Sequence, residues 1–374
     1  MLWRGMGIRD NNFDVLRLAA AVSVVLTHAI LLGEDRLSSD PLMRLTSGQC
    51  TLGVAGVFVF FAISGYLVTQ SLDATGRIAP FLAKRALRVY PGLAACLLLL
   101  AFVLGPLVSA LPPGGYFADA GSYRFVAANL LMDADDVNSL PGVRFTGFNA
   151  GAVVNGPLWS LPCEVLMYLM VAGLGSAGLL RAPVLAALFV AGIVANVLDT
   201  ASIGTLAGSA AWLLPFFIAG MALYRFRARP ILRLRYALAS LGALALAARF
   251  GFFIPVFAAC GSYLVIYLAF AGHWRVRAAR YGDLSYGLYI YGWPVEQLTV
   301  RALGGAAPGW QVFVIALPIT AAAAFLSWRL VEAPALSLKP RPRVVQDYPA
   351  LAPRVALVSP EPCEPAATLP GAGA

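Results

Sequence analysis

The sequence predicts an all-α polytopic membrane protein with about ten transmembrane helices. Of its 374 residues, 60% are hydrophobic and only 12% are charged, about half the charged share of an average soluble domain. Apolar runs of close to 20 residues suit membrane-spanning helices rather than the shorter strands of a barrel. The composition therefore excludes a soluble globular domain, a disordered chain and a fibrous one.

Ten apolar segments are long enough to cross a bilayer. They cover residues 13–32, 52–71, 92–111, 157–179, 183–199, 206–224, 236–250, 252–271, 284–303 and 310–329. With the N-terminus placed inside, twenty basic residues fall in inner segments, six fall in outer segments and Arg17 lies within the first span. By the positive-inside rule both termini are then cytoplasmic. The net charge of +9 reflects this orientation, and we expect no binding of nucleic acid.

Two connections are longer than ordinary turns. The outer one covers residues 112–156, and the inner one covers residues 72–91, where the spacing from Pro80 to Tyr90 predicts a short interfacial helix. We expect residues 1–334 to form the transmembrane domain and residues 335–374 to form a Pro-rich, disordered cytoplasmic tail. The five cysteines lack paired or metal-ligand spacing, so we expect neither a disulfide framework nor a metal site.

The first span carries three ionisable side chains, Asp14, Arg17 and His28. Such groups are expensive inside the hydrocarbon region, so each is a candidate for function. Arg17 and His28 are eleven residues apart, which places both on one helix face about 16 Å apart along the axis. A structural pair between Arg17 and Asp14 near the interface is an alternative to a functional role. His28 lies deeper, and we interpret it as functional.

Three carboxylates lie in or at the end of later spans. Glu164, in the fourth span, is expected at a depth compatible with contact to His28, where it would orient the imidazole as in a general-base pair. The alternative for Glu164 is a structural hydrogen bond between two helices. The aromatic ninth span around Glu296 is either an interface belt or a pocket wall. Glu332 is expected to pair with Arg329.

Two further features concern close packing and ligand binding. Ser64 and Gly65 in the second span either allow two helices to pack closely or place a hydroxyl in a cavity. Arg85 and Arg88 are neighbours on one helical face. Two adjacent guanidiniums suit a phosphate-bearing ligand, and anchoring to the inner membrane face is the alternative.

Together these segments resemble the acyltransferase-3 family of membrane-bound acyltransferases. Arg17 and His28 match the spacing of the family's opening span, GVFVFFAISGYLV resembles its second-span motif, and KRALRVYP matches its Arg-x-x-Arg pattern. The element around Trp159, Ser160 and Glu164 is similar to the family's tryptophan-serine-leucine…glutamate motif, and SYGLYIYGWPV and RLVEAP resemble its closing motifs. The matches run in order from residue 13 to residue 334.

The resemblance implies an O-acyltransferase of the bacterial inner membrane. The acyl group, most simply acetyl from acetyl-CoA, would be transferred to a hydroxyl. Because members of the family acylate surface polysaccharides or small molecules such as macrolides, we expect a carbohydrate acceptor, free or lipid-linked, with a macrolide-like molecule as the alternative. Membrane lipid surrounds the protein, and the oligomeric state is left open.

The resemblance also implies three groups of site residues. They are His28, Glu164 and Asp14 for catalysis; Arg17, Arg85 and Arg88 for the acyl-CoA; and Ser64, Trp159, Ser160 and Tyr289 for the substrate. In this scheme His28 is the general base, and Glu164 or Asp14 orients its imidazole. An acyl-histidine intermediate is an alternative to direct transfer. Gly292 stands where members of the family often carry a second His, so no role is assigned to such a residue here.

Two other classes of function compete with the enzyme. Ionisable groups inside the membrane are also typical of a transporter or flippase. An inverted repeat with paired broken helices would favour that class, and the sequence contains none that we detect. A structural membrane subunit is the third class, and it leaves the alignment of Arg17 with His28 unexplained.

Overall fold

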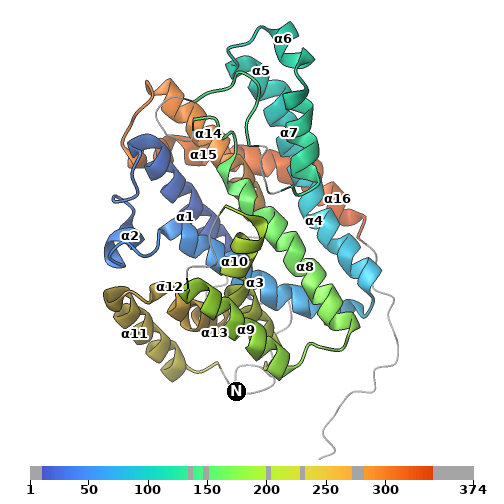
Figure 1. Ribbon diagram of the computed structural model, residues 1–374, viewed down its shortest axis with the longest axis vertical. Coiled ribbons are helices and arrows are strands. Elements are labelled where there is room, and N and C mark those ends of the chain that lie inside the picture. The colour runs from blue at the N-terminus through green and yellow to red at the C-terminus, as the bar shows by residue number, and fades with distance from the viewer. Residues whose placement is uncertain are drawn as a thin grey trace, which may run out of the picture. The chain divides into compact units, whose positions relative to one another are not determined.

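The computed structural model describes residues 11–133, 138–145, 151–198, 204–227, 232–271 and 282–339 (Figure 1). Within these ranges the chain forms helices and no strand. The helices are α1 (Phe13–Glu34), α2 (Pro41–Leu45), α3 (Leu52–Thr75), α4 (Ile78–Leu99), η1 (Leu100–Leu104), α5 (Gly105–Val108), α6 (Pro113–Ala118), α7 (Ala120–Leu130), η2 (Gly156–Trp159), α8 (Ser160–Ser176), α9 (Ala182–Val197), α10 (Leu206–Arg225), α11 (Leu234–Phe250), α12 (Phe253–Val256), η3 (Phe257–Gly261), α13 (Ser262–Ala271), α14 (Ser285–Ala302), α15 (Gly309–Ser327), η5 (Trp328–Glu332) and α16 (Ala333–Ser337).

The all-α membrane fold predicted from the sequence is confirmed. Each of the ten predicted segments contains a helix. Among the described residues, seven helices are long and apolar enough to cross a membrane, and α9 is a shorter apolar helix. The predicted tail, residues 335–374, is described only up to residue 339, and helix α16 extends into this described part. Residues 340–374 lie outside the described residues.

The inner connection differs from the prediction. Helix α3 continues to Thr75, Gly76 ends it with a positive φ of 65°, and α4 begins at Ile78. The segment Pro80–Tyr90 is therefore not a separate interfacial helix but the first part of a continuous helix that runs from Ile78 to Val108. Pro91 lies inside this helix; it removes one backbone donor, but the remaining hydrogen bonds hold the helix together. As a result, Arg85 and Arg88 are carried by a membrane-spanning helix.

Two of the three π-type turns in the described residues, η1 and η5, are followed closely by a proline. The turn η1 precedes Pro106 in α5, and η5 precedes Pro334 in α16. Proline cannot donate the usual i→i−4 hydrogen bond, and the turn before it is wider than an α-helical turn. In these two turns the amide of Gly105 donates to the carbonyl of Leu100, and the amide of Ala333 donates to the carbonyl of Trp328. The second of these turns carries Glu332, whose side chain is buried.

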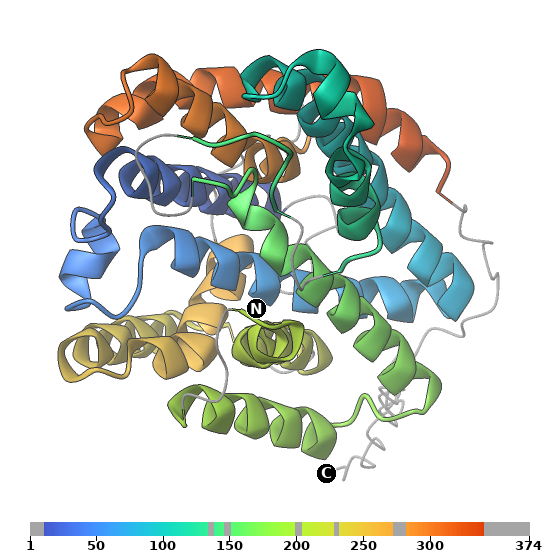
Figure 2. The ribbon, with the colours of Figure 1, turned by 45° about the horizontal axis from the view of Figure 1, so that its top comes forward.

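Helix α3 lies between α1 and α10, and α9 covers the far side of α10 (Figure 2). The crossing of α3 and α10 is tight: a Cβ atom on Gly65 would lie 2.0 Å from the carbonyl oxygen of Phe217, and one on Gly220 would lie 2.1 Å from the carbonyl oxygen of Ala62. Only glycine permits backbones to approach this closely. Gly65 therefore has the packing role that the sequence left open.

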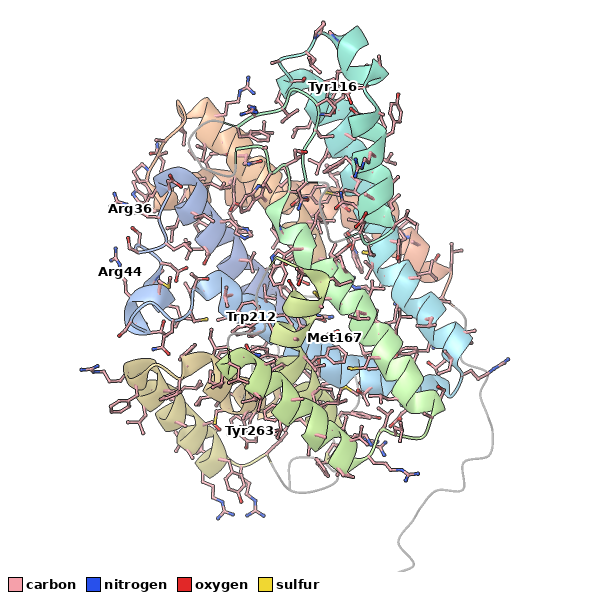
Figure 3. All side chains as sticks on the ribbon, in the orientation of Figure 1. Arg36, Arg44, Tyr116, Met167, Trp212 and Tyr263 are labelled. Carbon is pink, nitrogen blue, oxygen red and sulfur yellow. The ribbon has the colours of Figure 1, made fainter. Side chains whose placement is uncertain are left out.

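The C-terminal part of α1 is attached to the start of α3 through the buried carboxylate of Asp40. Asp40 accepts hydrogen bonds from the hydroxyl of Thr27 at 2.5 Å and from the backbone amides of Leu42, Met43 and Leu52. The Thr27 oxygen in turn accepts from the amide of Gly53. This network holds the helix turn that carries His28. Figure 3 shows Arg36 and Arg44 pointing away from the helices beside this network.

Two short helices, α6 and α7, follow α5 within the predicted outer connection (Figure 1). Tyr116, labelled in Figure 3, is fully buried there, and its hydroxyl donates to the carbonyl of Ala101 at 2.7 Å. The outer connection therefore contains folded helices, in addition to the residues 134–137 and 146–150 that lie outside the described ranges.

Candidate active site

An open cavity with about 830 Å³ of empty space, its mouth included, lies among α1, α3, α4, α8 and α14. Seven of the ten residues expected in the site line it: Arg17, Ser64, Arg85, Arg88, Ser160, Glu164 and Tyr289. Much of the remaining wall is apolar and comes from α3, α4 and α8. The cavity thus brings together residues from five helices, which span the sequence from Arg17 in α1 to Tyr289 in α14.

One end of the cavity is held by a network of arginines around Asp283, just before α14. Arg88 Nη2 lies 2.5 Å from Asp283 Oδ2, and Arg17 Nη2 lies 3.4 Å from the same oxygen. Burial raises the pKa of Asp283, but Arg88, Arg17 and hydrogen bonds from Ser285 outweigh it and hold the pKa below its usual range. Asp283 is therefore ionised at neutral pH and joins α1, α4 and α14.

Arg88 has further partners that occupy its guanidinium. Its Nη1 lies 3.8 Å from Glu332 Oε2, and the guanidinium lies over the ring of Tyr286 with 5.7 Å to the ring centroid. Glu332 is only 2% exposed and also accepts from the hydroxyl of Ser327 at 3.1 Å. The expected pairing of Glu332 with Arg329 is therefore wrong, because the π-type turn directs this carboxylate into the interior.

Arg85 differs from Arg88 in having no carboxylate partner in the described part of the chain. Its Nη2 lies 3.5 Å from Ser71 Oγ, and its guanidinium lies 5.9 Å from the centroid of the Tyr168 ring. Its Nε is buried and has no hydrogen-bond partner among the described residues. Of the two arginines predicted to bind phosphate, Arg85 is the one whose charge is available to a ligand.

Two lysines add to the positive charge near Arg85. Lys84 lies next to it in α4 and donates to the hydroxyl of Thr75 at 3.0 Å. Burial lowers the pKa of Lys339, and the nearby charges of Arg85, Arg88 and Lys84 lower it further. The four cations therefore lie close enough together to interact, at the end that the charge pattern predicts to face the cytoplasm.

Glu164 forms a second polar group in the cavity. Its Oε1 accepts a hydrogen bond from Tyr168 Oη and another from Ser64 Oγ at 3.3 Å. The expected contact between Glu164 and His28 is not formed, because the carboxylate faces α3 and its own helix instead. The structure therefore brings Ser64 and Glu164 together, as members of one site.

The start of α8 places Ser160 beside Tyr289 of α14. Their hydroxyl oxygens are 2.6 Å apart, and Tyr289 Oη also donates to the carbonyl of Pro157 at 3.0 Å. Trp159, the neighbouring residue, does not line this cavity. It lines a smaller one with Asn129, Asn138 and other residues.

His28 lies apart from the arginines, as the sequence predicts. Helix α1 is continuous, so the eleven residues from Arg17 to His28 correspond to about 16 Å. The imidazole is 18% exposed, packs nearly perpendicular to the ring of Trp293 at a centroid distance of 4.9 Å, and has its Nδ1 4.0 Å from Oε2 of Glu296. The carboxylate beside His28 is thus Glu296 of α14.

Asp14 cannot orient His28. The two residues are fourteen positions apart on the same straight helix, which corresponds to about 21 Å. Asp14 instead pairs with Arg17, one turn along. The expected contact of Asp14 with the imidazole is therefore wrong, and the alternative of a local Asp14–Arg17 pair is the one that the structure contains. A catalytic role for Asp14 by another route stays a prediction.

Sequence reasoning did not assign Asp283, and it did not connect Glu296 with His28. Glu296 satisfies the same criterion that selected His28 and Glu164, because it is an ionisable residue within an apolar segment. Asp283 lies in a connection, where a carboxylate costs little, so no local signal marks it. Gly292 lies one turn before Glu296. The backbone at Gly292 is packed closely against α1, because a Cβ atom there would lie 3.1 Å from Val25 Cγ2.

Comparison with known proteins identifies the family. The family with the description "Acyltransferase domain", acyltransferase-3, matches residues 10–329. The chain belongs to the acyltransferase-3 family. It is 28% identical over 336 residues to an O-acetyl transferase of Shigella phage Sf6, with 87% of this chain and 95% of the relative covered. It is 30% identical over 359 residues to Nodulation protein 10 of Rhizobium leguminosarum bv. viciae, with 88% and 94% covered. No solved structure gives a significant match.

The family and the fold together establish a multi-pass membrane O-acyltransferase. Family membership thereby favours the enzyme over the transporter and the structural subunit. Among the described residues no group of three or more His, Cys, Asp or Glu side chains gathers as a metal site would require.

Proposed function

We propose that the protein transfers an acyl group, most simply acetyl, from acyl-CoA to a hydroxyl of a carbohydrate at the bacterial inner membrane. The observation that carries this proposal is the open cavity with Arg17, Arg85 and Arg88 at the end predicted to face the cytoplasm. Acyl-CoA is a cytoplasmic polyanion, so a membrane enzyme that uses it needs a cationic entrance on that side.

The donor would bind with its phosphates at Arg85, aided by Lys84 and Lys339. Guanidinium groups bind phosphate oxygens through charge-assisted hydrogen bonds, and Arg85 has no carboxylate partner among the described residues to compete with them. The pantetheine arm would lie along the apolar wall of α3 and α8. Arg17 would contact the arm or the thioester end.

The reaction would take place near His28. Tyr289, at the wall of the cavity, is one helical turn before Trp293, which touches the imidazole. In direct transfer, His28 Nε2 accepts the proton of the acceptor hydroxyl while its oxygen attacks the thioester carbonyl. The carbon–sulfur bond then breaks, and the imidazolium returns the proton to the departing CoA thiolate. The alternative is an acyl-histidine intermediate, which would accumulate on His28 when donor is supplied without acceptor.

A carbohydrate acceptor is supported by the relatives named O-acetyl transferase and Nodulation protein 10 and by the resemblance set out above. Trp159 contributes an aromatic surface to the smaller cavity, beside the amides of Asn129 and Asn138. Aromatic faces with adjacent amide groups suit the apolar faces and hydroxyls of a sugar. We assign this smaller cavity to the acceptor; a macrolide-like acceptor is the alternative.

The test combines a cell assay with a purified one. Surface-polysaccharide O-acetyl content is measured in a strain that lacks the gene, complemented with the wild type or with His28→Ala at matched membrane levels. Ester should be lost on deletion and restored only by the wild type. Ester that is unchanged by the deletion would contradict the carbohydrate acceptor.

In the purified assay, thiol release from acetyl-CoA is followed in detergent, where no gradient exists for a transporter to use. His28→Ala should lower the rate by about 10²–10⁴-fold and leave CoA affinity unchanged. Ser23→Ala is the matched control, because this hydroxyl on the same helix donates to the carbonyl of Ala19, one turn before it. Retained activity in His28→Ala would refute the general-base assignment.

A further inference from the structure

Glu296 is a fully buried carboxylate that the proposed function does not yet use. It is 0% exposed, and neither of its oxygens has a hydrogen-bond partner among the residues that the structure describes. A carboxylate in a dry interior is costly unless it meets a donor or a positive charge. The side chain therefore needs a partner, and the position of that partner indicates its function.

The partner nearest to Glu296 is the imidazole of His28. Oε2 lies 4.0 Å from Nδ1, and the structure contains no other carboxylate within ion-pair distance of His28 in its described ranges. The distance is longer than a hydrogen bond. Catalytic hydrogen bonds are often long in the absence of ligand and shorten when substrate binds, and an approach of about 1 Å would bring these two atoms within hydrogen-bond distance.

Helix α14 holds both groups that face the imidazole. Trp293 and Glu296 are three residues apart and lie on one face of the helix. The indole nitrogen of Trp293 donates to the carbonyl of Val153 at 3.2 Å, and the amide of Gln297 donates to the same carbonyl at 2.9 Å. This turn of α14 is thus anchored on both sides of Glu296. The ring edge of Trp293 then limits how the imidazole can rotate.

We propose that Glu296 is the positioning residue of His28. Its carboxylate accepts the Nδ1–H hydrogen bond, selects the tautomer with a free lone pair on Nε2, and stabilises the imidazolium that forms when the acceptor hydroxyl is deprotonated. Glu296 thereby takes the role for which the sequence suggested Glu164 or Asp14. This inference rests on the proposed function, in which His28 is the general base.

The experiment compares Glu296→Gln and Glu296→Asp with the wild type in the purified assay with acetyl-CoA. Glu296→Gln should lower kcat by about 10²-fold or more while KM and the dissociation constant for CoA stay within twofold. Glu296→Asp should recover part of kcat, because the charge remains. Thr299→Val is the matched control: it removes a buried hydroxyl one turn further along α14, whose hydrogen bond within the described residues goes to the carbonyl of Val295 in the same helix.

Two further measurements separate positioning from loss of structure. In the pH profile of kcat, the acid limb should move to lower pH in Glu296→Gln, because the imidazole loses the charge that favours its protonated form. A change that only loosened α14 would not move this limb. In a double-mutant cycle, Glu296→Gln should have no additional effect on the residual rate of His28→Ala.

The outcomes distinguish this inference from the proposed function. If His28→Ala is active, the general-base assignment fails. If His28→Ala is inactive while Glu296→Gln keeps the wild-type kcat and acid limb, His28 remains the base and the role of Glu296 is refuted. If Glu296→Gln does not reach the membrane, Glu296→Asp decides: a kcat below the wild-type value with an acid limb at lower pH supports the role, because the shorter carboxylate lies farther from Nδ1. Wild-type kcat, or a loss of kcat with an unchanged acid limb, refutes it.

Discussion

Arg85 and Arg88 are one helical turn apart in sequence, yet the structure predicts different consequences when each is changed. Arg88 is paired with Asp283 at 2.5 Å and with Glu332 at 3.8 Å. Within the described residues, Arg85 contacts Ser71 at 3.5 Å and the Tyr168 ring but no carboxylate. Replacing each by glutamine removes the charge and keeps most of the side-chain stem, so packing changes little. The pair is therefore a matched test of which arginine binds the donor.

For Arg85→Gln we expect weaker CoA binding and an almost unchanged stability. A hydrogen bond to a charged group contributes about 1.5–3 kcal/mol, so the dissociation constant should rise roughly 10- to 100-fold. For Arg88→Gln we expect the reverse: a large loss of stability and a smaller direct effect on CoA binding. Removing one partner of a buried ion pair costs about 3–5 kcal/mol, because Asp283 and Glu332 are left without their shared cation.

The assay measures CoA binding by calorimetry and the unfolding midpoint in the same detergent, with free CoA used so that no acyl transfer occurs. If Arg85→Gln binds CoA as tightly as the wild type, the phosphate assignment is wrong. If both variants lose stability to the same degree, the distinction between a ligand-binding and a structural arginine is wrong as well.

Three other substitutions test the packing and the charges around the cavity. Gly65→Ala should destabilise the protein by about 1–3 kcal/mol, because the new Cβ would lie 2.0 Å from the carbonyl oxygen of Phe217. Gly242→Ala is the control and should leave stability unchanged, because its new Cβ would have nothing within 4 Å. Equal unfolding midpoints of the two variants would contradict the close crossing of α3 and α10. Asp40→Asn should cost about 1.5–3 kcal/mol, since this 0% exposed carboxylate caps α2 and bonds the first turns of α3; an unchanged midpoint would refute this. The pKa of Asp283 is lower in the folded state than its usual value, so its stabilising effect is complete above a pH of about 4 and is lost as the pH falls further. The difference in unfolding midpoint between the wild type and Asp283→Asn should therefore be constant from pH 8 to pH 5 and shrink below pH 4, and a difference that grows on acidification would show that the sign is wrong.

Much of the site could be predicted because burial inside a membrane makes polar residues conspicuous. His28, Glu164 and the arginines stand out against an apolar background, and their helical spacing gives their faces and approximate depths. The contact partners of these residues are harder to predict, because residues on several different helices can lie at the same depth. His28 was expected to meet Glu164, but it meets Glu296, which lies at a similar level on a different helix.

The sequence by itself determined the all-α membrane class of fold and the family, because hydrophobic length and motif spacing are properties of the chain read along one dimension. The tertiary structure alone decided which helices are neighbours. The Gly65 crossing places α3 against α10, and Asp283 joins Arg17 of α1 to Arg88 of α4. These pairings depend on contacts between residues far apart in the chain, whose energies no local pattern contains, and they divide the predicted residues between a donor cavity and the His28–Glu296 pair.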